Sequence, residues 1–483
     1  MYRFHPLERV DFVINPTSDS VYFMLKYSFE RVKIIMNRLE ILDLVRNFQN
    51  LIPQISGVAR NQEEEILQSI GSKPIKIISG FRRSGKSFLL VQVLKKLLEK
   101  KHCDLENILY LNFENLNLSF VNDAFALNEI YQVYLSEFGS KGKHLLVLDE
   151  IQKVKDWDKF IRTIYENKSL TNQDLEIIIT GSNSELLSAE LSSNLAGRFV
   201  EFFVLPFSFD EFLRYRNFEI KSKKDFQRNK SEIEKLFFEF VRYGALPETF
   251  SITEHKTKYS YLEGVVNKVI LDDVINRFNV KNTEIIEKIL HYLMSNIGNK
   301  LSYSKLTAYI KSLGYDIKQD TIVDYVHYIE KSFALFEIAK FDWKSQSIFS
   351  GNKKYYAIDT GIANFYKGLT ENFSRQLENI VYLDLVRKFQ VKNIFYGNDG
   401  KEIDFIVKRL GEQIFDKYQV CQDLNDDNFN RETTALLKAD EYLVSGQNIL
   451  ITLNNSEYEL ENIVQYNLIE FLLFPVDTDS LRG

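Results

Sequence analysis

The chain has 483 residues, of which 45% are hydrophobic and 27% charged, a composition typical of a globular protein with about two to four domains. Its formal net charge of −6 provides no overall basic surface for nucleic acid. The two cysteines, at positions 103 and 421, and the six scattered histidines exclude a disulfide framework and a zinc site built from neighbouring ligands. No stretch reaches the roughly 18 apolar residues of a membrane helix and no signal-peptide pattern is present, so we expect a cytoplasmic protein without a membrane partner.

The first part of the chain divides into an extension and a folded domain. Residues 1–36 form an N-terminal extension of uncertain structure, and from Met36 the text changes to an amphipathic helix. We therefore expect Met36 to be the natural start. Residues 37–205 are expected to form one domain, with a helical lead-in before its core.

A phosphate-binding loop is the strongest motif of that domain. Residues 80–87 read GFRRSGKS and fit the pattern G-x-x-x-x-G-K-[ST]. The β-branched run at 75–79 predicts a buried strand before the loop, and the apolar run at 88–98 predicts a buried helix after it. In this arrangement backbone N–H groups and the positive end of the helix point at phosphates, so the sequence predicts a nucleotide site.

The residues expected to contact the nucleotide are those of the loop: Gly80, Arg82, Arg83, Ser84, Gly85, Lys86 and Ser87. The two glycines allow backbone conformations that a Cβ would obstruct. Lys86 is expected to reach the β- and γ-phosphates, and the Ser87 hydroxyl is expected to bind Mg²⁺.

A second acidic motif follows about sixty residues later. The apolar run 145–148 ends in Asp149 and Glu150, which is the Walker B pattern. Asp149 is expected to hold Mg²⁺ through a water, and Glu150 to polarise the attacking water. An ordinary buried strand followed by two surface acids is the alternative, which the upstream loop makes less favourable.

Two later positions are candidates for contact with the γ-phosphate. The strand predicted over 176–183 ends in Ser182 and Asn183, either of which could sense that phosphate, although both residue types also favour helix N-caps. Arg198 is expected to reach the γ-phosphate from its own chain or from a neighbouring subunit, with a structural salt bridge as the alternative.

The alternation of strands and helices predicts an α/β fold with an open parallel sheet, and the strand between the two motifs indicates the additional-strand class of P-loop NTPases. The motifs together resemble the prokaryotic AAA-type ATPases with a C-terminal domain of unknown function. They are GFRRSGKS at 80–87, LDEIQ at 148–152, TGSN at 180–183 and LAGR at 195–198, followed by LPFSFDEF at 205–212 and YGALPE at 243–248.

The resemblance covers about residues 40–475 and implies ATP as the nucleotide. It also implies a helical lid at 206–280, a winged-helix-like domain at 281–349 and a PD-(D/E)xK nuclease-like α/β domain at 350–483. A helix, turn, helix and strand over 301–339 fit a winged helix. Its second helix offers Gln319, Asp320 and Asp324, so we favour protein interaction or packing over the reading of DNA bases.

The nuclease-like domain is expected to be inactive. Glu378 and Asp404 match two acids of such a site, but the third element, at 419–421, reads QVC and lacks both the metal-binding acid and the lysine. Asp384, Lys401 or Lys417 would have to take over the missing role.

The sequence therefore predicts a Mg²⁺-dependent ATPase whose hydrolysis is coupled to its C-terminal domains and to an unidentified protein partner. One alternative is a DNA-associated ATPase with a nuclease-like module, which the acidic pI of about 5.8 does not favour. The other is a nucleotide switch that hardly hydrolyses.

Overall fold

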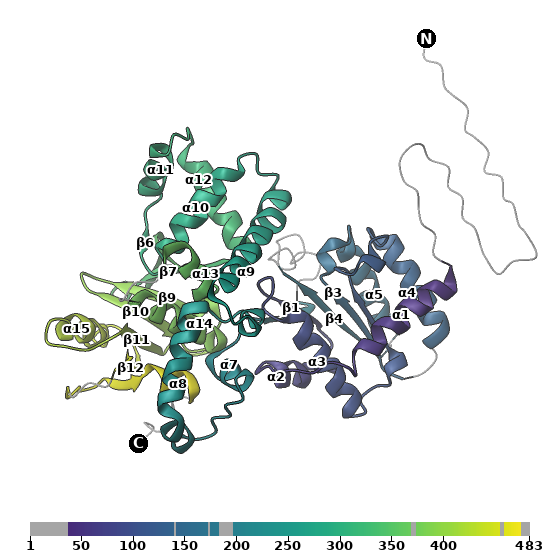
Figure 1. Cartoon of the computed structure of the whole chain (residues 1–483), viewed down its shortest axis with the longest axis horizontal. Coiled ribbons are helices and arrows are strands. Elements are labelled where there is room, and N and C mark those ends of the chain that lie inside the picture. The colour runs from purple at the N-terminus through teal and green to yellow at the C-terminus, as the bar shows by residue number, and fades with distance from the viewer. Residues whose placement is uncertain are drawn as a thin grey trace, which may run out of the picture.

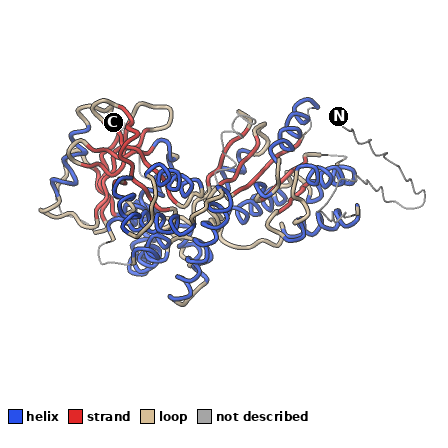
Figure 2. The backbone as a smooth tube through the Cα atoms, turned by 90° about the horizontal axis from the view of Figure 1, so that it is seen from above, coloured by secondary structure: helices blue, strands red, loops and turns tan. Residues whose placement is uncertain are grey.

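The computed structural model describes residues 37–139, 142–171, 174–182, 197–368, 373–454 and 458–474. The strands gather in two separate groups, which belong to an N-terminal unit (residues 37–204) and a C-terminal unit (residues 205–474) (Figures 1 and 2). The expected extension at 1–36, with its start at Met36, and Asn183 lie outside the described residues.

The helices and strands of the N-terminal unit are, in chain order, α1 (Arg38–Leu51), α2 (Glu63–Ser69), β1 (Ile75–Ser79), α3 (Lys86–Glu99), β2 (Ile108–Asn112), α4 (Ala124–Phe138), β3 (His144–Asp149), α5 (Trp157–Thr171), β4 (Leu175–Gly181) and β5 (Phe199–Phe203). All five strands pair in parallel, in the order β2-β3-β4-β1-β5. The four strands β1 to β4 are almost wholly buried, as their continuous apolar runs predict. Because β4 lies between β1 and β3, the predicted additional-strand class is confirmed.

Helices occur along the whole length of the C-terminal unit. They are α7 (Phe209–Tyr215), α8 (Lys223–Tyr243), α9 (His255–Lys268), the π-helical continuation η6 (Val269–Asn276), α10 (Thr283–Ser295), α11 (Tyr303–Ser312), α12 (Gln319–Lys331), α13 (Thr360–Lys367), α14 (Ser374–Phe389), α15 (Phe429–Ala439) and α16 (Leu468–Leu473). Its strands are β6 (Lys300–Leu301), β7 (Leu335–Asp342), β8 (Ser347–Ala357), β9 (Ile394–Asn398), β10 (Glu402–Lys408), β11 (Phe415–Cys421), β12 (Ser445–Thr452) and β13 (Val464–Asn467).

One mixed sheet of eight strands runs through the C-terminal unit in the order β13-β12-β11-β10-β9-β7-β8-β6. The hairpin β7–β8 joins this sheet because β7 pairs in parallel with β9, Lys340 opposite Tyr396 and Phe341 opposite Gly397. The domain boundary expected between 349 and 350 therefore falls inside β8, and the structure corrects it: both predicted domains contribute strands to one sheet.

Each unit has its own hydrophobic core, but a few residues of the N-terminal unit pack into the core of the C-terminal unit, among them Val58 and Phe203. The core of the N-terminal unit extends from Ile41 to Val204. The larger core of the C-terminal unit includes Leu205 and residues as far along the chain as Phe471, and a smaller one surrounds Trp343. Phe81, the second residue of the loop, is 1% exposed and belongs to the core of the C-terminal unit. The loop is therefore built into the contact between the two units.

Candidate nucleotide-binding site

The loop that joins β1 to α3 has the backbone that its glycines predict. Gly80 has φ +148°, and a Cβ there would lie 2.3 Å from the Val204 carbonyl oxygen. Gly85 has φ +93° and precedes Lys86, the first residue of α3. Both positions lie in the left-handed region that glycine tolerates best. The loop therefore leads directly into the positive end of α3, as phosphate binding requires.

Arg60 holds the loop from behind. Its guanidinium donates to the Ser84 carbonyl oxygen at 2.8 Å, to the Leu205 carbonyl oxygen at 2.8 Å and to Glu211 Oε1 at 3.0 Å. Glu211 closes a capping box with Ser208 at the start of α7. Burial acts to raise the pKa of Glu211, but the Arg60 charge and the backbone hydrogen bonds from Asn61 and Ser208 together outweigh it and lower that pKa. One buried ion pair thus connects the loop to both units, and nothing in the local sequence pattern around residue 60 marks it.

Lys86 and Glu150 face each other at the carboxyl end of the sheet. The Lys86 Nζ lies 3.4 Å from Glu150 Oε1 and donates to the Phe81 carbonyl oxygen at 3.1 Å. Both residues are buried, with 4% and 6% exposure. Burial acts to raise the pKa of Glu150, but Lys86 and further hydrogen bonds bring it below its ordinary value, so the carboxylate is ionised.

Asp149 ends β3 among donors from three elements. It accepts hydrogen bonds from Tyr110 at 3.2 Å, from Asn112 at 2.9 Å and from the Thr180 hydroxyl. The Ser87 hydroxyl lies close enough to this carboxylate to act on its pKa, so the two predicted Mg²⁺ ligands are neighbours. Burial, aided by the charge of Glu150, raises the pKa of Asp149 to about 6.

Three of these neighbours have no role in the sequence-based prediction: Tyr110, Asn112 and Thr180. Asn112 ends β2 directly opposite Asp149, and Thr180 lies near the end of β4 on the other side of β3. The sequence does contain a signal, which is the polar residue at the end of each strand. That signal identifies neighbours of Asp149 only when the order of the strands in the sheet is known.

Arg82 contacts carboxylates of both units. Its guanidinium lies 3.1 Å from Glu114 Oε1, which follows β2, and 3.4 Å from both Asp272 Oδ2 and Asp273 Oδ2 on η6. The side chain is 13% exposed. Burial opposes its charge, but Asp273, Glu114 and Glu150 together raise the pKa of Arg82.

Arg83 makes a more exposed contact with the C-terminal unit. Its Nη1 lies 3.1 Å from Glu248 Oε1, whose other oxygen accepts from the Tyr261 hydroxyl at 2.6 Å. Glu248 ends the turn predicted at 243–248, where the Ala245 N–H donates to the buried Asp359 at 2.6 Å. Asp359 in turn caps α13, so this turn connects the loop to the body of the C-terminal unit.

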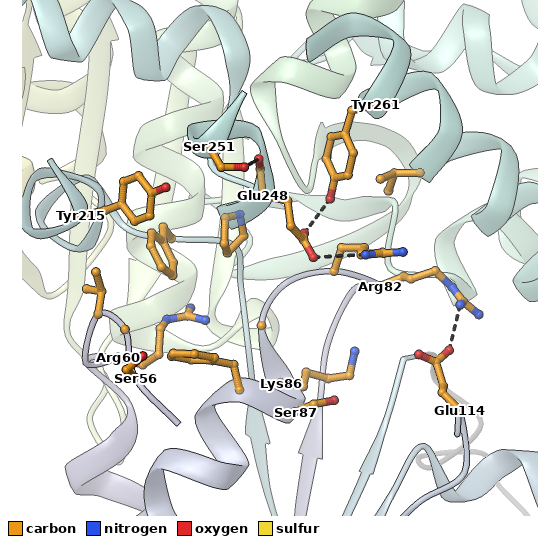
Figure 3. A pocket seen from close by; sticks show the side chains of 18 of the residues that line it. Ser56, Arg60, Arg82, Lys86, Ser87, Glu114, Tyr215, Glu248, Ser251 and Tyr261 are labelled. Carbon is orange, nitrogen blue, oxygen red and sulfur yellow. Dashed lines mark hydrogen bonds and ion pairs between the residues drawn. The ribbon is translucent and has the colours of Figure 1, made fainter. Parts of the chain in front are cut away.

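A cavity of about 1540 Å³ lies in front of the loop. Figure 3 shows Lys86 and Ser87 on the side of the cavity formed by the N-terminal unit, and Glu248 and Tyr261 on the side formed by the C-terminal unit. Gly85, Arg82, Arg83 and Glu150 also line it. Most of the predicted nucleotide contacts therefore meet at one cavity large enough for a nucleoside triphosphate.

The predicted role of Arg198 within its own chain is wrong. Its carbonyl oxygen accepts from the N–H of Ile75 at 2.8 Å, so it lies where β1 begins, whereas the loop follows the end of β1. A five-residue strand, about 16 Å long, separates the two ends. Arg198 instead lies 3.3 Å from Glu166, the salt bridge named as the alternative, and a contribution to a neighbouring subunit stays a prediction.

The donor set fits a nucleotide with Mg²⁺. Among the described residues, no group of three or more His, Cys, Asp or Glu side chains is arranged to hold a metal ion alone. Mg²⁺ commonly takes one or two protein ligands and completes its shell with phosphates and water, which suits Ser87 and Asp149. The Ser84 hydroxyl oxygen is buried without a partner in the part of the chain described, as in a loop that receives an acceptor-rich ligand.

A second lysine–carboxylate cluster lies in the C-terminal unit. Lys354 Nζ is 2.6 Å from Glu402 Oε1 and 3.2 Å from Glu378 Oε1, and Glu378 also accepts from Tyr356 and Arg375. Asp404 accepts from the Val420 N–H at 2.9 Å. Burial, aided by the charge of Glu378, raises its pKa well above the ordinary range.

The expected third element of this cluster carries no metal ligand. Gln419 donates to Glu432 at 2.7 Å, and Asp404 N–H donates to the Gln419 side chain at 3.2 Å. The three residues that might have replaced the missing acid or lysine bond elsewhere. Asp384 pairs with Lys388, Lys401 donates to the Asn430 carbonyl oxygen and Lys417 pairs with Asp440.

Two relatives place the chain in a family. An uncharacterized protein of Haemophilus influenzae is 31% identical over 416 residues, which are 86% of this chain and 98% of that protein. The uncharacterized protein MJ1544 of Methanocaldococcus jannaschii is 33% identical over 391 residues, 80% of this chain and 83% of that protein. The chain belongs to the family that contains these two proteins.

Models of two protein families match parts of the chain. An AAA domain matches residues 72–213, and a domain of unknown function, DUF8612, matches residues 234–372. The chain therefore combines an AAA-type P-loop ATPase domain with a C-terminal domain of unknown function. The second match extends across α10 to α13 and the hairpin β7–β8, so it includes segments from all three predicted C-terminal domains.

Solved structures give weaker likenesses. The Walker-type ATPase of Pyrococcus abyssi is 16% identical, with a TM-score of 0.42 over 65% of this chain and 99% of that one. AMPPCP-bound DnaA of Aquifex aeolicus is 17% identical, with a TM-score of 0.25 over 56% of this chain and 85% of that one. In the part of the chain that the structure describes, no helix is long and apolar enough to span a membrane.

Proposed function

We propose that the protein binds ATP with Mg²⁺ at the cavity beside residues 80–87 and hydrolyses it. The observation that carries the proposal is the meeting of Lys86, Ser87, Asp149 and Glu150 at the carboxyl end of one parallel sheet, where a 1540 Å³ cavity begins. Mg²⁺ held by Ser87 and Asp149 would supply neutralising charge to the phosphates.

The protein residues divide the work of hydrolysis. The loop N–H groups and Lys86 bind the phosphates, and Lys86 then exchanges its contact with Glu150 for one with the nucleotide. Glu150, ionised in the nucleotide-free protein, accepts a proton from water as the water oxygen bonds to the γ-phosphorus. The bond between the γ-phosphorus and the bridging oxygen breaks, so ADP and phosphate leave.

Hydrolysis is proposed to be coupled to the C-terminal unit through the loop itself. Phe81 is buried in the core of that unit, and Arg82 contacts Asp272 and Asp273 on η6. Phosphates beside the loop would compete with these carboxylates for Arg82, because a guanidinium binds both kinds of anion. The π-helical geometry of η6 is rare in proteins, and where it occurs it often lies at a functional site. This supports η6 as a segment that can adopt two arrangements.

The C-terminal unit is proposed to transmit this change to an unidentified protein partner. The order α10, β6, α11, α12, β7, β8 supports a winged-helix-like arrangement. The exposed acids Asp320 and Asp324 on α12 support a protein surface rather than DNA reading. The Lys354 cluster supports a nuclease-like scaffold without nuclease activity, since its carboxylates already have protein partners.

Hydrogen exchange tests the coupling. In Glu150→Gln, which is expected to bind MgATP without turnover, addition of MgATP should change exchange both at 80–87 and across 269–276. In the double variant with Arg82→Ala, the change at 269–276 should be lost while that at 80–87 remains. Arg46→Ala, an exposed arginine of α1, is the matched control. Changes confined to residues 80–87 and 149–150 in Glu150→Gln would contradict the coupling.

A further inference from the structure

Gln152 contacts the carboxylate that is proposed to activate water. It lies in the short 3-10 helix η3 (Ile151–Lys153), two residues after Glu150. Its Nε2 donates to Glu150 Oε2 at 2.5 Å and to Ser182 Oγ at 3.3 Å. Because an ionised carboxylate only accepts hydrogen bonds, the amide must turn its NH₂ toward Glu150.

The backbone brings Gln152 into this position. Glu150 has φ +56°, an uncommon conformation for a residue with a Cβ, and its N–H donates to Thr180 Oγ1 at 2.9 Å. The chain then turns tightly, with the Lys153 N–H bonded to the Glu150 carbonyl oxygen at 3.3 Å. The left-handed turn at Glu150 thus returns the side chain of residue 152 to its carboxylate. Uncommon backbone conformations of this kind persist where the surroundings hold them.

The two oxygens of Glu150 have different partners. Oε1 faces Lys86 at 3.4 Å, whereas Oε2 accepts from Gln152. Besides Lys86, the charge of Arg82 acts to lower the pKa of Glu150, and Glu150 in turn acts to raise the pKa of Asp149. When Lys86 engages a nucleotide, Oε1 loses its cation and becomes available to a water, but Oε2 keeps its amide donor.

We propose that Gln152 is the positioning residue of Glu150: it holds Oε2 so that Oε1 faces the reacting water. The proposal rests on the proposed function. Ser182, which the sequence offered as a sensor of the γ-phosphate, acts in this arrangement on the amide of Gln152. The end of β4 is thereby connected to the carboxylate of Glu150, which directly follows β3.

The test is a set of Gln152 variants of the full chain. Gln152→Met keeps the length of the side chain and removes the donor, and it should lower kcat about 10- to 100-fold, the range for a hydrogen bond to a charged group. The Kd for MgATP should stay within about twofold, because Gln152 acts in the step that follows binding. Gln152→Asn, which keeps the amide, should recover part of the lost kcat. Gln132→Met, at an exposed glutamine of α4, is the matched control.

A double-variant comparison separates positioning from general damage. With Glu150→Gln already in place, Gln152→Met should lower turnover no further, because the group it positions is gone. The positioning role is overturned if Gln152→Met leaves kcat unchanged, if Kd worsens in step with kcat, or if the two effects multiply. Wild-type turnover no higher than that of Glu150→Gln would overturn the proposed function as well, whereas normal wild-type turnover with an unaffected Gln152→Met would overturn this inference alone.

Discussion

Lys86 of the N-terminal unit and Lys354 of the C-terminal unit are both buried beside carboxylates, and they differ in how completely the lysine is satisfied. Lys86 meets one carboxylate, Glu150, at 3.4 Å and lines a large cavity. Lys354, 1% exposed, meets two carboxylates at 2.6 and 3.2 Å. Burial opposes the charge of Lys354, but Glu378, Asp404 and Glu402 outweigh it and raise its pKa.

The difference separates a ligand site from a structural one. A buried charge that already has partners of opposite sign gains little from a ligand, because the ligand would have to displace them. A lysine beside a cavity with a single carboxylate partner gains much more favourable interaction energy when it binds a phosphate. We therefore interpret the cluster of the N-terminal unit as functional and that of the C-terminal unit as structural.

The largest expected effect is on nucleotide affinity. Lys86→Ala should weaken MgATP binding about 10- to 100-fold, because it removes a charge-assisted contact with the phosphates. Lys354→Met should leave the affinity unchanged. Isothermal titration of both variants checks the contrast, and equal losses of affinity would contradict the assignment of the two sites.

The next effect is on stability, and its order is reversed. Lys354→Met removes the cation that the buried Glu378 and the half-buried Glu402 share. Breaking a buried ion pair typically costs about 3–5 kcal/mol, and we expect the lower end because Glu378 keeps Arg375 and Glu402 keeps Lys300. Lys86→Ala leaves Glu150 still bonded to Gln152 and should destabilise the nucleotide-free protein much less. Urea unfolding of the two variants measures this difference. A Lys354→Met protein as stable as the wild type would mean that the cluster is not structural.

The smallest effect concerns pH. The raised pKa of Asp404 means that the folded state favours its neutral form, so its contribution to stability is present at low pH and is lost as pH rises. Asp404→Asn keeps an acceptor for the Val420 N–H and removes the ionisation. Its melting temperature should therefore exceed that of the wild type by a few degrees at pH 8 and match it near pH 4. A variant less stable than the wild type at pH 8 would point to a needed negative charge, as in a metal site.

Sequence reasoning succeeded where a motif fixes its own geometry. The loop at 80–87 and the acids at 149 and 150 follow their strands directly, so their neighbourhood could be predicted from local pattern alone. Strand alternation was sufficient for the sheet class, and the order β2-β3-β4-β1-β5 confirmed it.

The remaining parts depend on contacts between distant segments. Arg60 reaches Glu211, and Arg82 reaches Asp272 and Asp273, across 150 or more residues of sequence. Lys354 reaches the cluster from β8, whereas the nuclease-like pattern places its lysine on the strand that carries Gln419. The position of Arg198 depends on the direction of β5, whose parallel pairing with β1 puts the start of β5 at the edge opposite the loop.

Steady-state ATP hydrolysis by the full chain, compared with Glu150→Gln in the presence and absence of duplex DNA, tests the central claim most directly. We predict Mg²⁺-dependent turnover that Glu150→Gln reduces by at least about 100-fold and that DNA does not stimulate. Turnover that persists in Glu150→Gln would contradict the catalytic assignment, and strong stimulation by DNA would favour a DNA-associated ATPase. Tight MgATP binding without any turnover would contradict hydrolysis and identify a nucleotide switch.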